Sequence, residues 1–296
     1  MSKASAFRRR RVTYDQLLKL AYKKVYQHDA EEEAAKLLLL ELSGMTPHAF
    51  YLSLKSPVEP AFETLYLEKL DEYLIEGKPV QHILGYSYFF GYKLYVDDRV
   101  LIPRPETEQL TDHVLYYYDR YFQKVQVRVL DLGTGSGCIG LTLAKEEPMM
   151  DVTISDISFD ALEVATKNQE LLKTQATVIQ SDLFENIKGT FDIIVSNPPY
   201  IPDDEAVGRT VDKEPDVALY GGKLGIEFYE KILNEASKYL NSKGLIAFEH
   251  GYQQKEAIYQ SAKNNFPEAI ILQMKDLAGK DRFTLIGLGG VLSEEK

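Results

Sequence analysis

Hydrophobic residues near the N-terminal end of the chain recur at the spacing of an α-helix. Between residues 14 and 76 the chain is rich in Leu, Ala, Glu and Lys, and apolar positions lie three or four apart, as at Leu17 and Ala21. Ser43-Gly44 and Ser56-Pro57 interrupt this pattern with residues that favour turns. The spacing therefore predicts a small bundle of three or four amphipathic helices. Without an evident reactive cluster, such a bundle is typical of a recognition module.

The remainder of the chain changes to short apolar runs separated by helical segments. An aromatic-rich run at 86–100, interrupted by Gly91, predicts a β-hairpin. The runs that predict buried strands are 127–132, 152–156, 176–180, 191–196, 244–249 and 283–286. Alternating strands and helices of this kind predict an α/β fold with a doubly wound, mostly parallel sheet.

These patterns divide the chain into five parts. We expect a basic arm at 1–11, a helical substrate-recognition domain at 12–84, a hairpin linker at 85–102, an α/β domain at 103–290 and a tail at 291–296. The arm contains four consecutive arginines and is expected to be disordered and solvated.

A glycine-rich turn follows the run at 127–132. The turn is Gly133-Thr134-Gly135-Ser136-Gly137, and an apolar helix is expected from Cys138, whose thiol is expected to fill space. Strand, glycine turn and helix together bring backbone N–H groups and a helix N-terminus up to a cofactor. The glycines alone suit either NAD or S-adenosylmethionine. Asp131 ahead of three alternate glycines favours S-adenosylmethionine.

Acidic residues follow the next two predicted strands. Asp156 lies about twenty residues beyond the glycine turn, where a carboxylate can accept both hydroxyls of a ribose. It could instead cap the helix that begins near Ser158. Asp182 is placed to accept from the adenine amino group while Leu183 packs on the ring, although a plain turn aspartate is the alternative.

The strand-like run at 191–196 ends in Asn197-Pro198-Pro199-Tyr200. The Asn197 side-chain carbonyl and the backbone carbonyl before Pro199 are both acceptors, and the two prolines remove competing N–H donors. Tyr200 offers a ring face to a flat group. The motif is therefore interpreted as a clamp for a planar NH2 group, the alternative being a proline-terminated turn.

Composition and charge argue against several classes of protein. The chain has 296 residues, a net charge of −11 and one cysteine, and it carries no CxxC or Cys/His cluster that would suggest a metal. All of the net charge lies beyond residue 80, which argues against stable contact with nucleic-acid phosphates. We see no run long enough to span a membrane and no signal segment, so we expect a cytoplasmic protein.

Five stretches together resemble the protein-(glutamine-N5) methyltransferases that act on peptide chain release factors. They are Gln81 to Gly85, Leu101 to Glu108, Val129 to Gly137, Ser196 to Ile201, and Glu214-Pro215 with Ala218 to Gly222. The segment Arg104-Pro105-Glu106-Thr107-Glu108 is the most particular to this family. Two positions depart from its pattern: Leu224 stands where an Asp is expected before Gly225, and His250 stands where an Ile usually separates Glu249 from Gly251.

The resemblance implies a class I S-adenosylmethionine-dependent methyltransferase with a seven-stranded sheet. It implies methyl transfer to the glutamine of the Gly-Gly-Gln motif in class I release factors, which modulates translation termination. The residues assigned to the cofactor are Asp131, Gly133, Thr134, Gly135, Ser136, Gly137, Asp156, Asp182, Leu183 and Asn197. Those assigned to the glutamine and its closure are Asn197, Pro198, Pro199, Tyr200, Arg104, Glu106 and Thr107, with Asn197, Pro198 and Tyr200 as catalytic residues.

Three other functions remain open on the sequence. The same clamp would serve methylation of a glutamine in a ribosomal protein, and it would also grip the amino group of adenine. An adenine enzyme usually extrudes its base and grips phosphates, for which this chain has no basic face. A cofactor-binding module without catalysis is the non-enzymatic alternative.

Overall fold

The computed structural model describes residues 11–123 and 125–294, which form two compact units. The helical unit contains the described residues up to Gly85 together with Arg209–Lys213, and the sheet unit contains Tyr86–Gly208 and the residues from Glu214 onward. Most of the predicted basic arm lies outside the described residues. Its last residue, Arg11, forms an ion pair with Glu59 at 2.8 Å.

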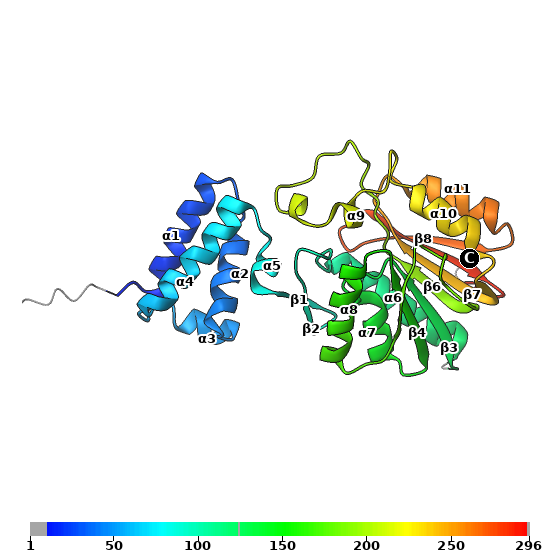
Figure 1. Ribbon diagram of the computed structural model, residues 1–296, viewed down its shortest axis with the longest axis horizontal. Coiled ribbons are helices and arrows are strands. Elements are labelled where there is room, and N and C mark those ends of the chain that lie inside the picture. The colour runs from blue at the N-terminus through cyan, green and yellow to red at the C-terminus, as the bar shows by residue number, and fades with distance from the viewer. Residues whose placement is uncertain (1–10, 124, 295–296) are drawn as a thin grey trace, which may run out of the picture. The chain divides into compact units, whose positions relative to one another are not determined.

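The helical unit confirms the predicted bundle but contains more helices than the three or four expected (Figure 1). Its helices are α1 (Tyr14–Gln27), α2 (Glu32–Ser43), α3 (Pro47–Leu52), α4 (Pro60–Asp71), the π-helix η1 (Glu72–Glu76), α5 (Val80–Leu84) and the 3-10 helix η2 (Val211–Lys213). A reciprocal pair of hydrogen bonds between Thr13 and Gln16 caps α1, which satisfies two N–H groups of its first turn. In the core, the hydroxyl of the fully buried Tyr66 donates to the carbonyl of Ala35 at 3.0 Å.

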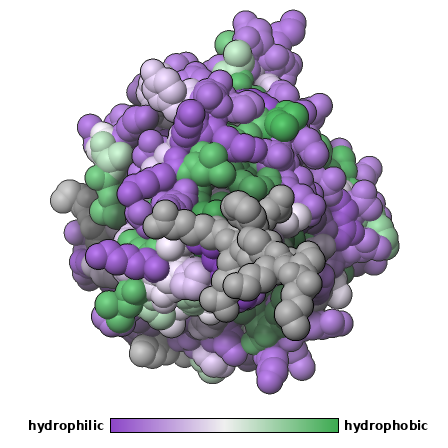
Figure 2. Space-filling view, turned by 90° about the vertical axis from the view of Figure 1, so that its left-hand side faces the viewer, coloured by the Kyte–Doolittle hydropathy of each residue, from purple (hydrophilic) through white to green (hydrophobic). Residues whose placement is uncertain are grey.

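The helical unit also exposes several large hydrophobic side chains, among them Tyr26 and Leu52. The face of the molecule in Figure 2 likewise shows small hydrophobic patches scattered among hydrophilic side chains. Scattered apolar groups of this kind are normal on a protein surface.

A seven-stranded sheet forms the centre of the sheet unit, in the order β5-β4-β3-β6-β7-β9-β8. The strands are β3 (Val127–Leu132), β4 (Met150–Asp156), β5 (Thr177–Gln180), β6 (Phe191–Ser196), β7 (Leu240–Glu249), β8 (Ile270–Lys275) and β9 (Asp281–Leu288). The first five strands of this order pair in parallel, whereas β9 pairs antiparallel with both β7 and β8. The predicted doubly wound, mostly parallel sheet is confirmed.

Helices cover both faces of this sheet (Figure 1). On one face lie α6 (Pro105–Phe122), α7 (Cys138–Glu146) and α8 (Phe159–Leu172), and on the other lie α10 (Glu227–Ala236) and α11 (Lys255–Asn265). The short α9 (Asp216–Leu219) follows β6. In β6, Ile193 and Val195 join the core on the α6–α8 side and Ile194 joins the opposite core, so the strand is buried on both faces and forms a continuous apolar run.

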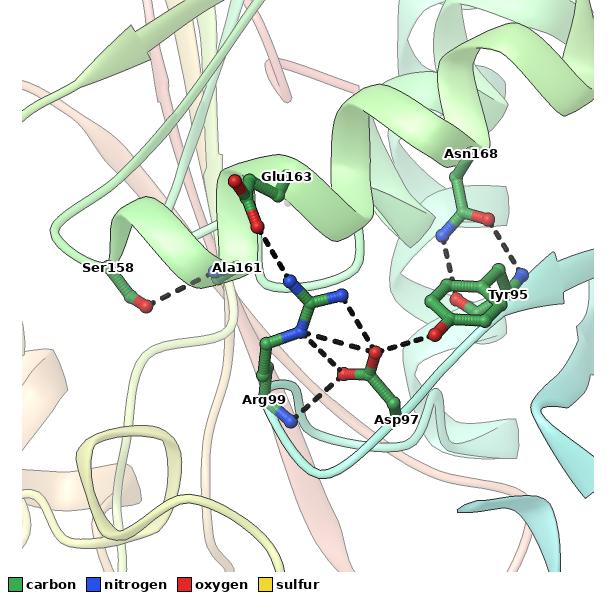
Figure 3. Close-up of polar contacts among 7 residues, drawn as sticks. All are labelled: Tyr95, Asp97, Arg99, Ser158, Ala161, Glu163 and Asn168. Atoms are coloured by element: carbon green, nitrogen blue, oxygen red, sulfur yellow. Dashed lines mark hydrogen bonds and ion pairs between the residues drawn. The ribbon is translucent and has the colours of Figure 1, made fainter. Parts of the chain in front are cut away.

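The predicted hairpin consists of β1 (Tyr86–Phe89) and β2 (Tyr92–Tyr95), which pair antiparallel. Asn168 of α8 fastens the end of β2 (Figure 3): its Oδ1 accepts from the backbone N–H of Tyr95 at 2.7 Å, and its Nδ2 donates to the carbonyl of Tyr95 at 2.9 Å. The same Nδ2 donates to the carbonyl of Ser136 at 2.9 Å. One fully buried side chain therefore joins the hairpin to the glycine-rich turn.

The observed strands extend past several of the predicted runs. β7 begins at Leu240 and β9 continues to Leu288, while the strand at β8 was not predicted as a separate run. No helix within the described ranges is both long and apolar enough to cross a membrane.

Candidate active site

Asp131 holds the glycine-rich loop between β3 and α7 from its buried side. Its Oδ2 accepts from the hydroxyl of Thr134 at 2.6 Å and from the backbone N–H of Gly140 at 2.9 Å. Burial raises the pKa of Asp131 to about 6, and these two hydrogen bonds oppose the rise. The loop turns through positive φ at Gly133, Gly135 and Gly137.

The first two glycine positions of this loop face open space. A Cβ added at Gly133 or Gly135 would meet nothing within 4 Å, whereas a Cβ at Gly137 would lie 2.6 Å from Leu141 Cδ1. The first two glycines therefore leave the backbone accessible to a ligand, and the third permits close packing at the start of α7.

Asp156 lies at the carboxyl end of β4, beside the glycine-rich loop. Its Oδ2 accepts from the backbone N–H of Gly135 and its Oδ1 from that of Ser158, both at 2.9 Å. Burial raises its pKa, and the hydrogen bonds from the backbone oppose the rise. The cap of α8 is Ser158, whose hydroxyl accepts from Ala161 N–H at 3.2 Å (Figure 3). Asp156 is thus left with lone pairs on both oxygens.

Asp182 and Leu183 follow β5 and line the same cavity as the glycine-rich loop. Leu183 has a φ of 48°, an unusual conformation for a branched side chain. The hydroxyl of Ser181 donates to the carbonyl of Leu183 at 2.8 Å and so holds this turn. Sparsely populated backbone conformations cluster at ligand sites, so this turn is a candidate for contact with a ligand.

Asn197 and Pro198 come directly after β6 and also line this cavity. The hydroxyl of Ser196 donates to the carbonyl of Leu132 at 2.6 Å, which joins the end of β6 to the end of β3. The Asn197 Nδ2 donates to the hydroxyl of Thr107 at 3.3 Å. The parallel arrangement of β3 and β6 therefore brings the clamp and the glycine-rich loop to one edge of the sheet.

A glycine-rich segment packs against the backbone of the clamp. An ideal Cβ at Gly221 would lie 2.2 Å from the carbonyl oxygen of Pro199, and one at Gly225 would lie 2.1 Å from that of Tyr200. The side chain of Gln254 donates to the same Tyr200 oxygen at 3.2 Å. Burial raises the pKa of the Tyr200 phenol to about 12. Only residues without a Cβ fit at these two positions.

The residues expected to close the site lie in different surroundings. Arg104 lines the cavity and forms an ion pair with Glu214, whose other oxygen accepts from the backbone N–H of Ile102 at 2.8 Å. Thr107 also lines the cavity and is buried. Glu106 is half-buried and is not among the described residues that line the cavity.

The segment after the hairpin adds residues that the sequence did not single out. Arg99 lines the cavity, and its guanidinium contacts both oxygens of Asp97 and, at 2.7 Å, Glu163 of α8 (Figure 3). Burial alone would raise the pKa of Asp97, but the hydrogen bonds from Arg99 and Tyr95 bring it down to about 2. The contacts fix the path of the segment over the cavity.

Most of the candidate residues therefore meet in one place. Within the described part of the chain the lining includes every candidate except Asp131, Gly137, Tyr200 and Glu106, of which Asp131 lies behind the loop and Tyr200 packs near Gly251. Further lining residues that sequence reasoning missed include Arg99, Val100, Leu101, Ile139, Ile157 and Phe228. Leu101 begins one of the stretches that carry the family resemblance, but no pattern in the sequence distinguished these lining residues from core residues.

Comparisons with known proteins agree with this arrangement. The model of the methyltransferase small domain matches residues 119–248, and the model of the PrmC N-terminal domain matches residues 16–85. A methyltransferase from Pyrococcus furiosus shares the fold, with a TM-score of 0.51 and 21% identity over 76% of this chain and 95% of that one.

Full-length relatives give a more specific result. A release factor glutamine methyltransferase from Bacillus cereus is 34% identical over 271 residues, which cover 90% of this chain and 95% of that protein. Another of the same description, from Bacillus subtilis, is 38% identical over 278 residues, which cover 91% and 96%. This chain therefore belongs to the family of release factor glutamine methyltransferases.

Proposed function

We propose that this protein transfers a methyl group from S-adenosylmethionine to the side-chain amide nitrogen of the glutamine in the Gly-Gly-Gln motif of class I release factors. The observation that carries the proposal is that Asn197 and Pro198 line the same cavity as the glycine-rich loop. An amide clamp and a cofactor loop thus open on one space. The names of the relatives support glutamine as the acceptor and a release factor as its carrier.

The residues present suit S-adenosylmethionine. The open backbone at Gly133 and Gly135 leaves room for a ligand against the loop, and Asp156 keeps lone pairs for ribose hydroxyls at the end of β4. Asp182 and Leu183 would flank the adenine from the end of β5. The bound cofactor supplies a methyl group on a sulfonium, and these residues would orient it toward Asn197.

The clamp addresses the low reactivity of an amide. The nitrogen lone pair is delocalised into the carbonyl, which makes the amide nitrogen a poor nucleophile. The Asn197 Oδ1 and the Pro198 carbonyl would accept its two N–H groups and hold the nitrogen in line with the methyl group. The glutamine nitrogen held in this way would take the methyl group, the sulfonium would leave as a neutral thioether, and the nitrogen would release one proton to water. Positioning and fixed dipoles would supply most of the acceleration.

The helical unit would recognise the folded release factor in this proposal, since no reactive group is evident among its described residues. Binding through surfaces remote from the glutamine would help to position it. We place the reaction in the cytoplasm, where translation termination takes place, and expect no stable binding to nucleic acid or membrane.

The test is transfer of radiolabelled methyl from S-adenosylmethionine to purified, unmethylated class I release factor, with the label mapped by tandem mass spectrometry. We expect one methyl group on the Gly-Gly-Gln glutamine and none on a release factor in which that glutamine is Ala. Label on ribosomal protein or on adenine in DNA, with none on the release factor, would refute the proposed substrate.

Two variants make the test specific to the clamp. Asn197→Ala should lower kcat by about two to three orders of magnitude, as removal of an oriented polar group does elsewhere, with little change in cofactor affinity. Asn241→Ala is the matched control, because its Nδ2 bonds to Asp192 at 2.7 Å away from the cavity. Equal activity of the two variants would contradict the role of Asn197.

A further inference from the structure

Glu249 is a buried carboxyl group next to the clamp. It is the last residue of β7 and is 1% exposed. β6 and β7 are parallel and pair Ser196 with Phe248, so the following residues, Asn197 and Glu249, leave neighbouring strands at the same edge. The Oε2 atom of Glu249 has no hydrogen-bond partner among the described residues. A buried polar atom of this kind calls for an explanation.

Thr107 and Asn197 lie close enough to this carboxyl group to act on its charge. Both interact with it through their side chains, and both interactions lower its pKa. Asn197 Nδ2 also donates to the hydroxyl of Thr107 at 3.3 Å. Three polar side chains, from α6, from the residue after β6 and from the end of β7, therefore form one group, which we call the Glu249 cluster (Thr107, Asn197 and Glu249).

The two ends of an asparagine amide have nearly the same shape, but one donates and the other accepts. A carboxylate only accepts, so it favours the amide NH2 on its own side and disfavours the amide oxygen there. The hydroxyl of Thr107 can accept from Asn197 and donate its proton to Glu249. Together these contacts give the cluster one direction of hydrogen bonding.

We propose that ionised Glu249 is a positioning residue that keeps the Asn197 amide with Nδ2 turned toward the Glu249 cluster and Oδ1 turned toward the cavity. The inference rests on the proposed function, because Oδ1 is the atom that would accept an N–H of the substrate glutamine. Without the Glu249 carboxylate, the Asn197 amide would also adopt the flipped orientation. Its NH2 group would then face the cavity and meet an N–H of the substrate glutamine, donor against donor.

The charges around Glu249 come from several elements. Burial raises its pKa to about 7, while Arg282 of β9 lowers it and Glu106 of α6 raises it. Glu249 also interacts electrostatically with the phenols of Tyr200 and Tyr229 and with the thiol of Cys138. Because the pKa is raised, Glu249 loses its negative charge as the pH falls through about 7. The proposed orienting effect should weaken over the same range.

The first test is Glu249→Gln, which keeps the shape of the side chain and removes its charge. Wild-type kcat should fall on the acid side of a midpoint near pH 7, whereas the variant should be at least about tenfold slower at pH 8 and lack this acid limb. Cofactor affinity should stay within about twofold, since Glu249 does not line the cavity. Wild-type turnover and pH profile in this variant would overturn the inference.

A second set of variants keeps the inference testable if Glu249→Gln fails to fold. Thr107→Val should lower kcat, while Thr107→Ser, which keeps the hydroxyl, should retain it. Thr111→Val is the matched control, because this buried hydroxyl lies one turn along α6 and donates to the backbone carbonyl of Thr107 at 3.1 Å. Equal effects of the two valine substitutions would count against the inference.

A measurement without turnover separates this inference from the proposed function. In protein labelled with 15N-asparagine, the Asn197 NH2 signals are identified by their loss in Asn197→Ala. They should shift with a midpoint near pH 7 in the wild type and stay constant in Glu249→Gln. Constant signals in the wild type between about pH 5.5 and 8.5 would refute the positioning role, whatever substrate the enzyme methylates.

Discussion

Replacing Gly221 by Ala should slow methyl transfer while leaving the cofactor site intact. The backbone at this position does not have positive φ, so an Ala is not strained by its own conformation. Its Cβ would, however, lie 2.2 Å from the oxygen and 2.8 Å from the carbon of the Pro199 carbonyl, where ordinary contact begins at 3.4 Å. The added Cβ and the Pro199 carbonyl are both fixed to the backbone, so no change of side-chain rotamer can relieve the overlap.

The size of the effect follows from the overlap. To restore ordinary contact, the backbone at Pro199 and the segment at Gly221 must separate by roughly 1 Å, and a misplacement of that size costs up to about 100-fold in rate. Overpacking also destabilises a fold by about 1–3 kcal/mol, so turnover must be measured well below the unfolding temperature. We expect kcat to fall between about tenfold and 100-fold with cofactor affinity within about twofold.

Gly208→Ala is the control for this substitution. It adds the same methyl group in the same connection after β6, but its Cβ would meet nothing within 4 Å and its φ is not positive. Single-turnover methyl transfer to release factor, with calorimetric titration of the cofactor, separates the two steps. A folded Gly221→Ala protein with the turnover of Gly208→Ala would refute the claim that close approach of this segment sets the clamp.

Two further predictions concern the cofactor side of the site. Asp131 has a raised pKa, so the folded state favours its neutral form, and its contribution to stability is lost as the pH rises from the unfolded value near 4 to about 6. The unfolding free energy of the wild type, measured by urea titration, should therefore fall relative to Asp131→Asn by about 1–3 kcal/mol over that range, and parallel curves would contradict it. Asn168→Ala would leave the N–H and carbonyl of Tyr95 and the carbonyl of Ser136 without their partner. It should cost about 2–4 kcal/mol of stability and weaken cofactor binding, which thermal unfolding and titration would measure, and unchanged values would contradict the link between hairpin and loop.

The fold could be predicted where burial follows a simple pattern along the chain. The central strand β6 is buried on both faces and coincides with the predicted run at 191–196. β8 at Ile270–Lys275 was missed because it lies at the edge of the sheet and nearly every residue in it is half-buried. Such a strand shows neither a continuous apolar run nor strict alternation.

The candidate site likewise combines residues that are consecutive in the sequence with residues that only the fold brings together. The glycine-rich loop and the Asn197 clamp were predictable because each consists of consecutive residues at the end of one strand. Glu249 and Gly221 were not, because their places beside the clamp depend on the pairing of β6 with β7 and on the packing of a loop. Asp131 was expected at the cofactor, but its hydrogen bonds place it behind the loop, where it fixes the loop's shape.

The two departures from the family pattern fall at positions where the structure supplies polar partners. At the turn containing Leu224, the carboxylate of Glu227 accepts from the N–H of Leu224 at 3.3 Å and from that of Ile226 at 3.0 Å. His250 is buried, and its two ring nitrogens contact the carbonyl of Gly251 and the hydroxyl of Thr284. Because burial lowers its pKa, the ring is neutral near pH 7 and adds no positive charge beside Glu249. The acceptor chemistry of the clamp is therefore compatible with both departures.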